Sequence, residues 1–504
     1  MNSKRFLGPL DAADDGDLQQ HFISPDELDA ILTPQCHVIY GGKGIGKTAL
    51  RRALTELHRA DFFTAGTVDL NKLNFQRVYQ ELEKLEHATG EDTVALARAT
   101  WRNVIAMYFL ELAAQEGAPD DFVTNVEKLL SDEYFSARNA PTRILNQVER
   151  FFERLGTIAL EDEPASAPRS ITETIRSTVA DYPRGEEFRR TLLRACAIVA
   201  ESGKKAVICV DGFDSVVDHL PESRKAIFAG LIDSVYQFAN DAEMSRALCV
   251  KAFLPKELTH EARAINWDAD KFLYNTRYLY WDEESLKEFI QKRLTPHLRS
   301  KKGDFDGVWQ EFMPKEVRNL VHGIDESSFA YILRHTQFRP RQLLFHVQTI
   351  LDNWDKKSTA FRVDASFLPS TVATSNKKLA ELAVAQLEYA RPGITTFIRS
   401  FGGSTNTIRF ADCYSKISRM FECKTPLECR RVFDELFDFG VLGIAKSSGA
   451  TDGGSTIKVR FGYAGEGVTA PYAADDDIVA LCPMFHDYSG CTRSEFGAVI
   501  PSSV

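Results

Sequence analysis

The sequence predicts an α/β fold, and three observations support this prediction. Apolar strands alternate with helical patterns between residues 36 and 293, as in a parallel sheet with helices on both faces. A glycine-rich loop, residues 41–48, lies directly between one strand and one helix. A second apolar run, residues 205–211, ends in an aspartate. We therefore expect a parallel sheet with a helical insertion, followed by a helical region and a winged-helix-like C-terminal domain.

The bulk composition narrows the class of protein. At roughly 100–200 residues per domain, the 504 residues predict two to four domains. Hydrophobic residues make up 44% and charged residues 26%, which is enough apolar material for packed cores. The formal net charge of −10 argues against a surface that is basic throughout for nucleic acid, although a local basic patch remains open.

Cysteine usage and hydropathy predict the compartment. The nine cysteines form no C-x-x-C pair, and their number is odd. We interpret them as buried free thiols in a reducing compartment rather than as zinc or disulfide sites. The N-terminus has no apolar signal core, and no run reaches about 18 apolar residues. We expect a cytoplasmic protein without a membrane partner.

The first elements of the predicted sheet follow in order along the chain. An amphipathic helix is expected at 25–32, before an apolar strand at 36–40. The glycine-rich loop is followed by a helix at 49–57, because its apolar residues recur at helical spacing. A second apolar strand is expected at 62–70.

A long helical insertion then interrupts the sheet. Apolar residues recur on a helical period from about residue 75 to 199, which is long for a simple crossover. Residues 161–169 are rich in proline, serine and charge and predict a loose loop. The remaining strands are expected at 205–211, 246–254 and 278–281, and Asp282 is expected to cap a helix at 283–293.

After Pro296 the sequence predicts helices first and then a pair of strands. The pattern stays helical from Pro296 to about residue 353, and further helices are expected near 377–390 and 426–438. Two strands, 440–445 and 457–463, should pair across the turn-rich segment 447–455. A helix followed by such a hairpin is the outline of a winged helix.

The glycine-rich loop fits the pattern G-x-x-x-x-G-K-[ST] of a phosphate-binding loop. Its glycines let the backbone turn N–H groups inward onto a phosphate, and the following helix directs its positive dipole end to the same place. Lys47 would reach the β- and γ-phosphates, and the Thr48 hydroxyl would coordinate Mg²⁺. The expected nucleotide-binding residues are Gly41, Gly42, Lys43, Gly44, Ile45, Gly46, Lys47, Thr48 and Ala49.

Two aspartates are the candidate acids of this site. Asp211 ends a buried strand, so it should emerge at the carboxyl edge of the sheet and serve with Thr48 as a metal ligand. The alternative is an aspartate that caps the next turn. Hydrolysis also needs a group that positions water, and Asp214 is the nearest acid because residue 212 is glycine. If Asp214 does not act, hydrolysis would be slow or would depend on a partner.

Four segments together resemble a known family: residues 6–14, 41–49, 210–214 and 338–344. With them the chain resembles, over roughly residues 1–350, the AAA+/STAND division of P-loop ATPases, and within it bacterial ATPases found in antiviral defence loci. The expected cofactors are ATP and Mg²⁺. The chain is expected to form a homo-oligomer and to control a separately encoded effector, because it carries no recognisable nuclease, protease or deaminase constellation of its own. The implied domains are a core at 1–285 with the insertion at about 75–199, a helical lid at 286–370 and the winged-helix-like domain at 371–504.

The resemblance also implies a proline and a basic residue of the lid near the nucleotide. Pro340 would pack on the adenine, and Arg339 or Arg341 would sense the γ-phosphate. The alternative is a helix-starting proline between solvated arginines. The polar sensor of the fourth strand is missing or displaced in residues 251–255, and neither Arg263 nor Arg277 is favoured as an arginine finger.

The charge of the C-terminal domain bears on nucleic acid binding. Residues 371–504 contain 14 Lys+Arg and 15 Asp+Glu, whereas phosphate contacts need surplus positive charge. Four basic residues could still share a face, so DNA remains possible but an intramolecular or protein contact is favoured. These residues are Arg430, Arg431, Lys458 and Arg460.

Three functions remain open at this point. The favoured one is an ATP-hydrolysing switch that acts through conformational change. The second is an assembly scaffold that holds nucleotide with little hydrolysis, which the glycine at 212 favours. The third is a DNA-handling ATPase, which the acidic balance disfavours. We see no N/T-K-x-D motif for guanine, so ATP is expected rather than GTP.

Overall fold

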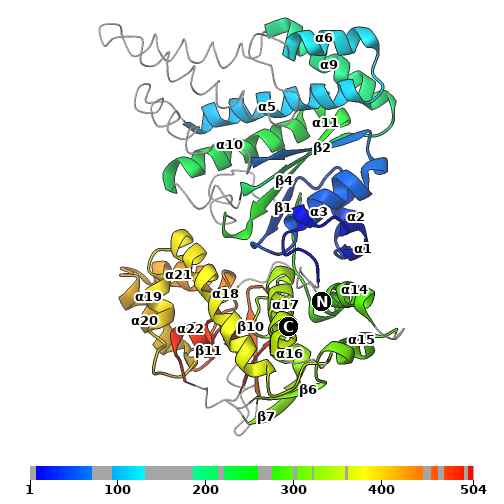
Figure 1. Cartoon of the computed structure of the whole chain (residues 1–504). Coiled ribbons are helices and arrows are strands. Elements are labelled where there is room, and N and C mark those ends of the chain that lie inside the picture. The colour runs from blue at the N-terminus through cyan, green and yellow to red at the C-terminus, as the bar shows by residue number, and fades with distance from the viewer. Residues whose placement is uncertain are drawn as a thin grey trace. The chain divides into compact units, whose positions relative to one another are not determined.

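The computed structural model shows two compact units, which we describe separately (Figure 1). The parallel-sheet unit comprises Asp26–Gly41 and Lys47–Arg277, and the C-terminal unit comprises Met1–Pro25, Gly42–Gly46 and Tyr278–Val504. The structure describes residues 7–70, 93–130, 185–213, 221–258, 275–298, 303–319, 323–357, 361–445, 456–463, 470–492 and 498–502.

A five-stranded parallel sheet forms the centre of the first unit, as the sequence predicts, but its last strand lies at Thr276–Tyr278 rather than at the predicted 278–281. Its strand order is β2-β3-β4-β1-β5, and the printed registers of β2/β3, β3/β4 and β4/β1 are all parallel. All residues of β3 and β4 are buried, because helices cover both faces of the sheet. The strands are β1 (Val38–Gly41), β2 (Thr64–Asp69), β3 (Ala206–Asp211), β4 (Leu248–Pro255) and β5 (Thr276–Tyr278).

Long helices cover one face of this sheet and α3 covers the other (Figure 1). α10 crosses α5 closely, since a Cβ added at Gly230 would lie 2.6 Å from the backbone nitrogen of Arg98. The α-helices are α2 (Leu28–Leu32), α3 (Lys47–Arg52), α5 (Thr93–Gln115), α6 (Asp120–Leu130), α9 (Gly185–Glu201), α10 (Pro221–Asn240) and α11 (Met244–Ala247). A π-helical segment, η2 (Ala53–Leu57), and two 3-10 helices, η3 (Arg59–Asp61) and η6 (Lys256–Leu258), complete the set.

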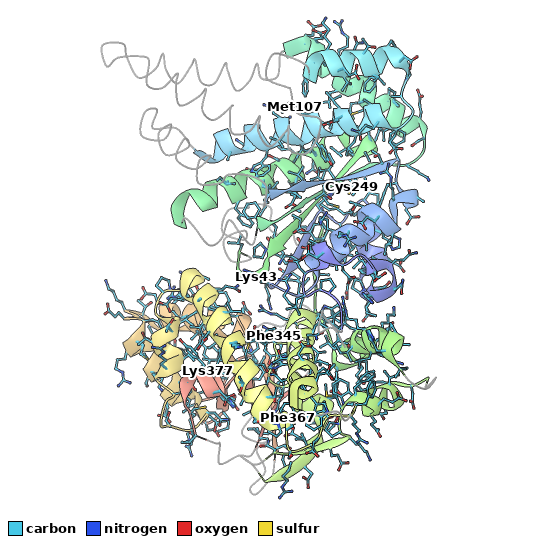
Figure 2. The ribbon with its side chains drawn as sticks, viewed as in Figure 1. Lys43, Met107, Cys249, Phe345, Phe367 and Lys377 are labelled. Carbon is cyan, nitrogen blue, oxygen red and sulfur yellow. The ribbon has the colours of Figure 1, made fainter. Side chains whose placement is uncertain are left out.

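The predicted insertion consists of helices and one short connection, 116–119, where the structure describes it. α5, α6 and most of α9 lie within residues 75–199, as expected. The predicted loose loop at 161–169 lies outside the described residues. The side chains of Met107 on α5 and Cys249 on β4 are buried, and both are labelled in Figure 2.

Helices and one hairpin form the first part of the C-terminal unit. Asp282 caps α14 through a 2.7 Å bond from the Ser285 N–H to its carboxylate, as predicted. The helical pattern expected from Pro296 to about 353 is wrong at one place, because Glu316–Asn319 and Ile324–Ser327 pair as antiparallel strands. The elements are η1 (Ala12–Asp14), α1 (Leu18–His21), α14 (Glu283–Leu294), η7 (Thr295–His297), α15 (Phe305–Phe312), β6 (Glu316–Asn319), β7 (Ile324–Ser327), α16 (Ser328–Leu333) and α17 (Pro340–Lys357).

The N-terminal residues are anchored on this helical part. Asp15 is buried, and its carboxylate accepts hydrogen bonds from Arg293 at 2.9 Å and lies 3.1 Å from His21 Nδ1. Burial alone would raise the pKa of Asp15, but the contacts with His21 and Arg293 hold that pKa below its ordinary value. The Leu7 N–H donates to the Gln348 side chain at 2.9 Å, which fixes the start of the segment on α17.

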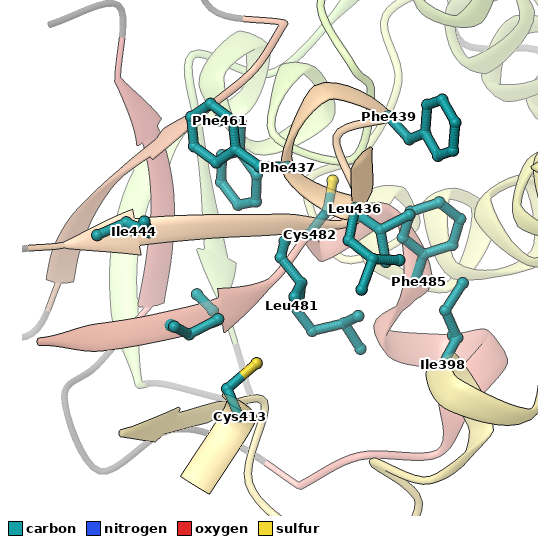
Figure 3. Packing of buried hydrophobic residues seen from close by; sticks show 14 of the residues in the cluster. Ile398, Cys413, Leu436, Phe437, Phe439, Ile444, Phe461, Leu481, Cys482 and Phe485 are labelled. Atoms are coloured by element: carbon teal, nitrogen blue, oxygen red, sulfur yellow. The ribbon is translucent and has the colours of Figure 1, made fainter. Parts of the chain in front are cut away.

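A second five-stranded sheet with its own core completes the C-terminal unit. Its order is β12-β10-β9-β11-β8, and β9 and β10 pair antiparallel as predicted, while β10 and β12 are parallel. Aromatic and aliphatic residues fill the core (Figure 3). The elements are α18 (Leu368–Ala390), α19 (Ile394–Arg399), β8 (Thr407–Arg409), α20 (Phe410–Met420), α21 (Pro426–Asp438), β9 (Leu442–Ala445), β10 (Thr456–Phe461), β11 (Ile478–Leu481), η9 (Pro483–Phe485), α22 (His486–Ser489) and β12 (Ala498–Ser502).

The structure also describes the cysteines and the hydropathy of the helices. All nine cysteines are free, and seven of them are buried. Among the helices that the structure describes, none is both long and apolar enough to cross a membrane.

Candidate functional site

The glycine-rich loop has the strand–loop–helix context that its motif requires. Gly41 is the last residue of β1, and α3 begins at Lys47. Gly44 and Gly46 have φ angles of 82° and 109°, a backbone region that costs other residues free energy. These two glycines therefore allow the tight backbone turns that a phosphate-binding loop needs.

Lys47 is held at the beginning of this helix. Its side chain is buried, and the ammonium donates a hydrogen bond of 2.7 Å to the carbonyl of Gly41. A buried ammonium is costly unless such partners surround it, so the position of Lys47 is well defined. The cation is thereby kept next to the loop backbone.

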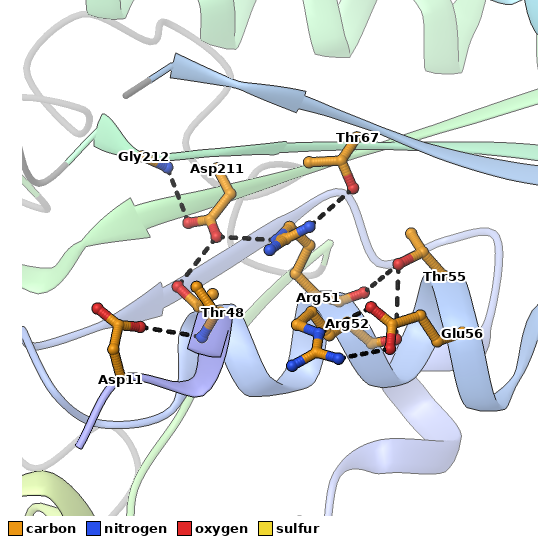
Figure 4. A network of polar contacts seen from close by, with 10 residues as sticks. Asp11, Thr48, Arg51, Arg52, Thr55, Glu56, Thr67, Asp211 and Gly212 are labelled. Atoms are coloured by element: carbon orange, nitrogen blue, oxygen red, sulfur yellow. Dashed lines mark hydrogen bonds and ion pairs between the residues drawn. The ribbon is translucent and has the colours of Figure 1, made fainter. Parts of the chain in front are cut away.

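Asp211 lies at the end of β3 and contacts the helix that follows the loop (Figure 4). Its carboxylate oxygen Oδ2 accepts a hydrogen bond from the Thr48 hydroxyl at 3.1 Å. The same oxygen accepts a hydrogen bond from Arg51 Nε, also at 3.1 Å. The structure therefore brings together Thr48 and Asp211, the two residues that the sequence predicts as metal ligands.

These two side chains fit the chemistry of Mg²⁺. The ion prefers oxygen ligands and usually keeps several waters while it is bound by one or two protein groups and by phosphates. A hydroxyl and a carboxylate 3.1 Å apart supply two such oxygens beside the loop. Thr48 and Asp211 would therefore hold Mg²⁺, and the ion would supply charge neutralisation for the phosphates.

Gly212 explains why an acid does not follow Asp211 directly. Its φ is 98°, in the region that favours glycine. In this conformation its N–H donates a 2.8 Å hydrogen bond to Asp211 Oδ1, which fixes the carboxylate. Asp214, the predicted water-positioning residue, lies outside the described residues.

Within the C-terminal unit, Arg339 and Arg341 contact residues 42–44 of the loop. The Arg339 guanidinium donates to the Lys43 carbonyl at 3.1 Å, and a Cβ added at Gly42 would lie 3.0 Å from that guanidinium. The Arg341 N–H donates to the Gly44 carbonyl at 3.4 Å. The arginines are therefore more than solvated neighbours of a proline.

Pro340 is the first residue of α17 and is buried. A proline suits the first turn of a helix because its missing N–H is not needed there. The helix-starting interpretation of Pro340 thus holds in the structure. Arg341 is also tied to the N-terminal segment, since it pairs with Asp11 at 3.5 Å and donates to the Leu10 carbonyl at 3.2 Å.

Sequence reasoning missed two residues of this region. Trp281 Nε1 donates a hydrogen bond of 2.7 Å to the carbonyl of Ile45, within the C-terminal unit. Arg51 contacts Asp211 within the parallel-sheet unit. A tryptophan in a short aromatic run and an arginine on a helix carry no specific sequence signal, so neither stood out.

Lys251, in the strand expected to carry a polar sensor, has a structural role. Its side chain is fully buried, and the ammonium donates to the carbonyls of Ile31, Thr33 and Cys36 at 2.6, 2.9 and 2.9 Å. A lysine suits the carboxyl end of a helix, and here it secures the end of α2. Arg277 donates to the Thr276 carbonyl, and Arg263 lies outside the described residues.

The basic residues considered for DNA binding are partly used within the fold. Arg430 pairs with Asp434 at 2.8 Å and donates to the carbonyl of Ala470 at 2.9 Å. Arg431 and Lys458 are exposed, and Arg460 is half-buried on the same strand as Lys458. Because Arg430 is bound within the fold, the four residues do not form one continuous basic face that is free for DNA.

Comparison with known proteins does not assign the chain to a family. The chain matches no family model and no curated protein sequence.

Proposed function

We propose that the chain is an ATP-binding and ATP-hydrolysing molecular switch. The arrangement of Lys47, Thr48 and Asp211 carries this proposal. A buried lysine at the start of a helix, a hydroxyl one residue later and a carboxylate 3.1 Å from that hydroxyl are the groups that phosphate and Mg²⁺ binding requires. The glycine conformations of the loop support the same conclusion.

A short segment of the C-terminal unit supports the switch part of the proposal. Arg339 contacts the loop at Lys43, while two residues earlier the Gln337 side chain donates to the Phe439 carbonyl at 2.9 Å. Phe338 lies between them with φ 52°, a conformation that costs a non-glycine residue about 1–3 kcal/mol. A shift of the loop on binding phosphate would therefore be transmitted to the end of α21.

Nucleotide binding with little hydrolysis is the second candidate function. The observation that favours it is the φ of 98° at Gly212, because an acid in that position would be strained. The site would then depend on Asp214 or on a partner for positioning water. A homo-oligomer and a separate effector extend the proposal, and the role in antiviral defence rests on the resemblance alone.

ATP turnover by the purified chain distinguishes the two functions. We expect Mg²⁺-dependent turnover by the unaltered protein, its loss in Lys47→Ala, and loss in Asp214→Ala with binding retained. The same turnover should be unchanged when DNA is added. Nucleotide binding that depends on Lys47 without any turnover would support the scaffold, and stimulation by DNA would support a DNA-handling ATPase.

A further inference from the structure

Arg51 contacts Asp211, the carboxylate that is proposed as a metal ligand. It is on α3, one turn after the loop, and its side chain is 15% exposed. Its Nε donates to Asp211 Oδ2 at 3.1 Å, the same oxygen that accepts the Thr48 hydroxyl at 3.1 Å. Asp211 Oδ2 therefore accepts hydrogen bonds from the Arg51 guanidinium and from the Thr48 hydroxyl. Thr48 is the residue that would bind Mg²⁺ together with Asp211.

The charge of Asp211 explains why a cation is needed there. The Asp211 side chain is 8% exposed, and an ionised carboxylate that is so buried costs free energy unless it is paired and hydrogen-bonded. Gly212 supplies one hydrogen bond to Oδ1, and Arg51 supplies the opposite charge at Oδ2. Without bound metal, the guanidinium compensates the carboxylate.

The guanidinium is held in this orientation from the other side. Arg51 Nη1 donates to the Thr67 hydroxyl at 3.1 Å, and Thr67 lies on the edge strand β2. The Tyr108 hydroxyl accepts the Thr67 N–H at 3.1 Å, and burial raises the pKa of Tyr108 to about 12. A Cβ at Gly66 would lie 2.6 Å from that hydroxyl, so glycine makes room for it.

We propose that Arg51 is a positioning residue that competes with Mg²⁺ for Asp211. In the metal-free protein it pairs with Asp211 and orients its carboxylate, and when Mg²⁺ is bound it must give up or share Oδ2. Two cations at one carboxylate oxygen repel each other, so Arg51 raises the Mg²⁺ concentration that nucleotide binding needs. This inference rests on the proposed nucleotide site.

The test is binding of a fluorescent ATP analogue during a Mg²⁺ titration from a chelator baseline. Arg51→Gln should lower the Mg²⁺ concentration at half-maximal binding by about tenfold, because the competing cation is gone. Arg52→Gln is the matched control: it removes the same charge one residue later, where Arg52 pairs with Glu56. It should leave the midpoint unchanged.

A second variant covers the case in which Arg51→Gln does not fold. Thr67→Val keeps the β-branched shape on β2 but removes the hydroxyl that orients Arg51, and should lower the midpoint by about threefold. A midpoint that is unchanged or higher in the folded variants would overturn the inference and leave the nucleotide site intact. Absence of nucleotide binding in the unaltered protein at every Mg²⁺ concentration would overturn the proposed function and this inference together.

Discussion

At Gly44 the loop leaves little room for a side chain. Its φ is 82°, and an added Cβ would lie 3.1 Å from the Cβ of Arg341. Gly44→Ala should therefore lower the free energy of unfolding by about 2 kcal/mol, from backbone strain and overpacking together. The same change should weaken nucleotide binding, since it alters the backbone that would surround the phosphates. Chemical denaturation and nucleotide titration measure the two effects.

Gly117→Ala is the control for the strain in that prediction. Gly117 has φ 71° and no atom within 4 Å of an added Cβ, so the substitution adds strain without a clash. It should cost about 1 kcal/mol and leave nucleotide binding unchanged. Equal destabilisation in both variants would show that contact with Arg341 does not constrain the loop.

Single residues of the candidate site can be predicted from the sequence when they stand in a local pattern. Lys47 and Thr48 stand in a motif with fixed spacing, and Asp211 ends an apolar strand, so all three could be named in advance. Arg51 and Trp281 could not, because their contacts with Asp211 and Ile45 join residues more than 150 positions apart. Long-range partners of single side chains have no local signal.

Among the elements, α17 and α18 carry a buried titratable contact. His346 is fully buried on α17, and its Nδ1 lies 2.7 Å from the Ser375 hydroxyl on α18. Burial lowers the pKa of His346 to about 4 from an ordinary value of 6.5. The unfolded chain therefore binds a proton between pH 6.5 and 4 that the folded chain does not bind.

This difference predicts acid sensitivity with a definite sign. The stabilisation from neutral His346 is complete above pH 6.5 and should decline by roughly 3 kcal/mol as the pH falls to 4. His335, whose pKa burial also lowers, adds to the same trend. The measurement is the free energy of unfolding from pH 7 to 4.5.

His346→Gln tests the assignment to one side chain. The variant keeps a polar side chain near Ser375 but cannot titrate, so its stability should change less over this pH range than that of the unaltered protein. Identical pH profiles for the two proteins would show that His346 is not the group responsible.

Element predictions from sequence fail where the pattern is short or the pairing is distant. β6 and β7 are four residues each and carry charged residues on their exposed positions, so they do not stand out from the helical pattern around them. β9 and β10 were predictable because β9 is apolar, β10 alternates apolar with polar residues, and the two follow each other in the chain. The parallel pairing of β10 with β12 joins distant residues, which periodicity alone does not reveal.

At the scale of the whole molecule, we propose that residues 41–48 bind a nucleotide. The net charge of −10 makes nonspecific binding of a polyanion to the chain unfavourable, so nucleotide binding would have to come from a local site. Lys47 contributes the cation that the proposed site needs next to the phosphates. Loss of one such charge-assisted contact costs about 1.5–3 kcal/mol.

The most direct measurement is isothermal titration of ATP with Mg²⁺ into the unaltered protein, Lys47→Ala and Lys204→Ala. Lys204 is a lysine outside the loop whose ammonium donates to the Ala60 carbonyl, so its removal controls for the change in net charge. We expect saturable binding by the unaltered protein and Lys204→Ala, and binding at least about tenfold weaker in Lys47→Ala. Equal affinity in all three proteins, or no binding by the unaltered protein, would contradict this expectation.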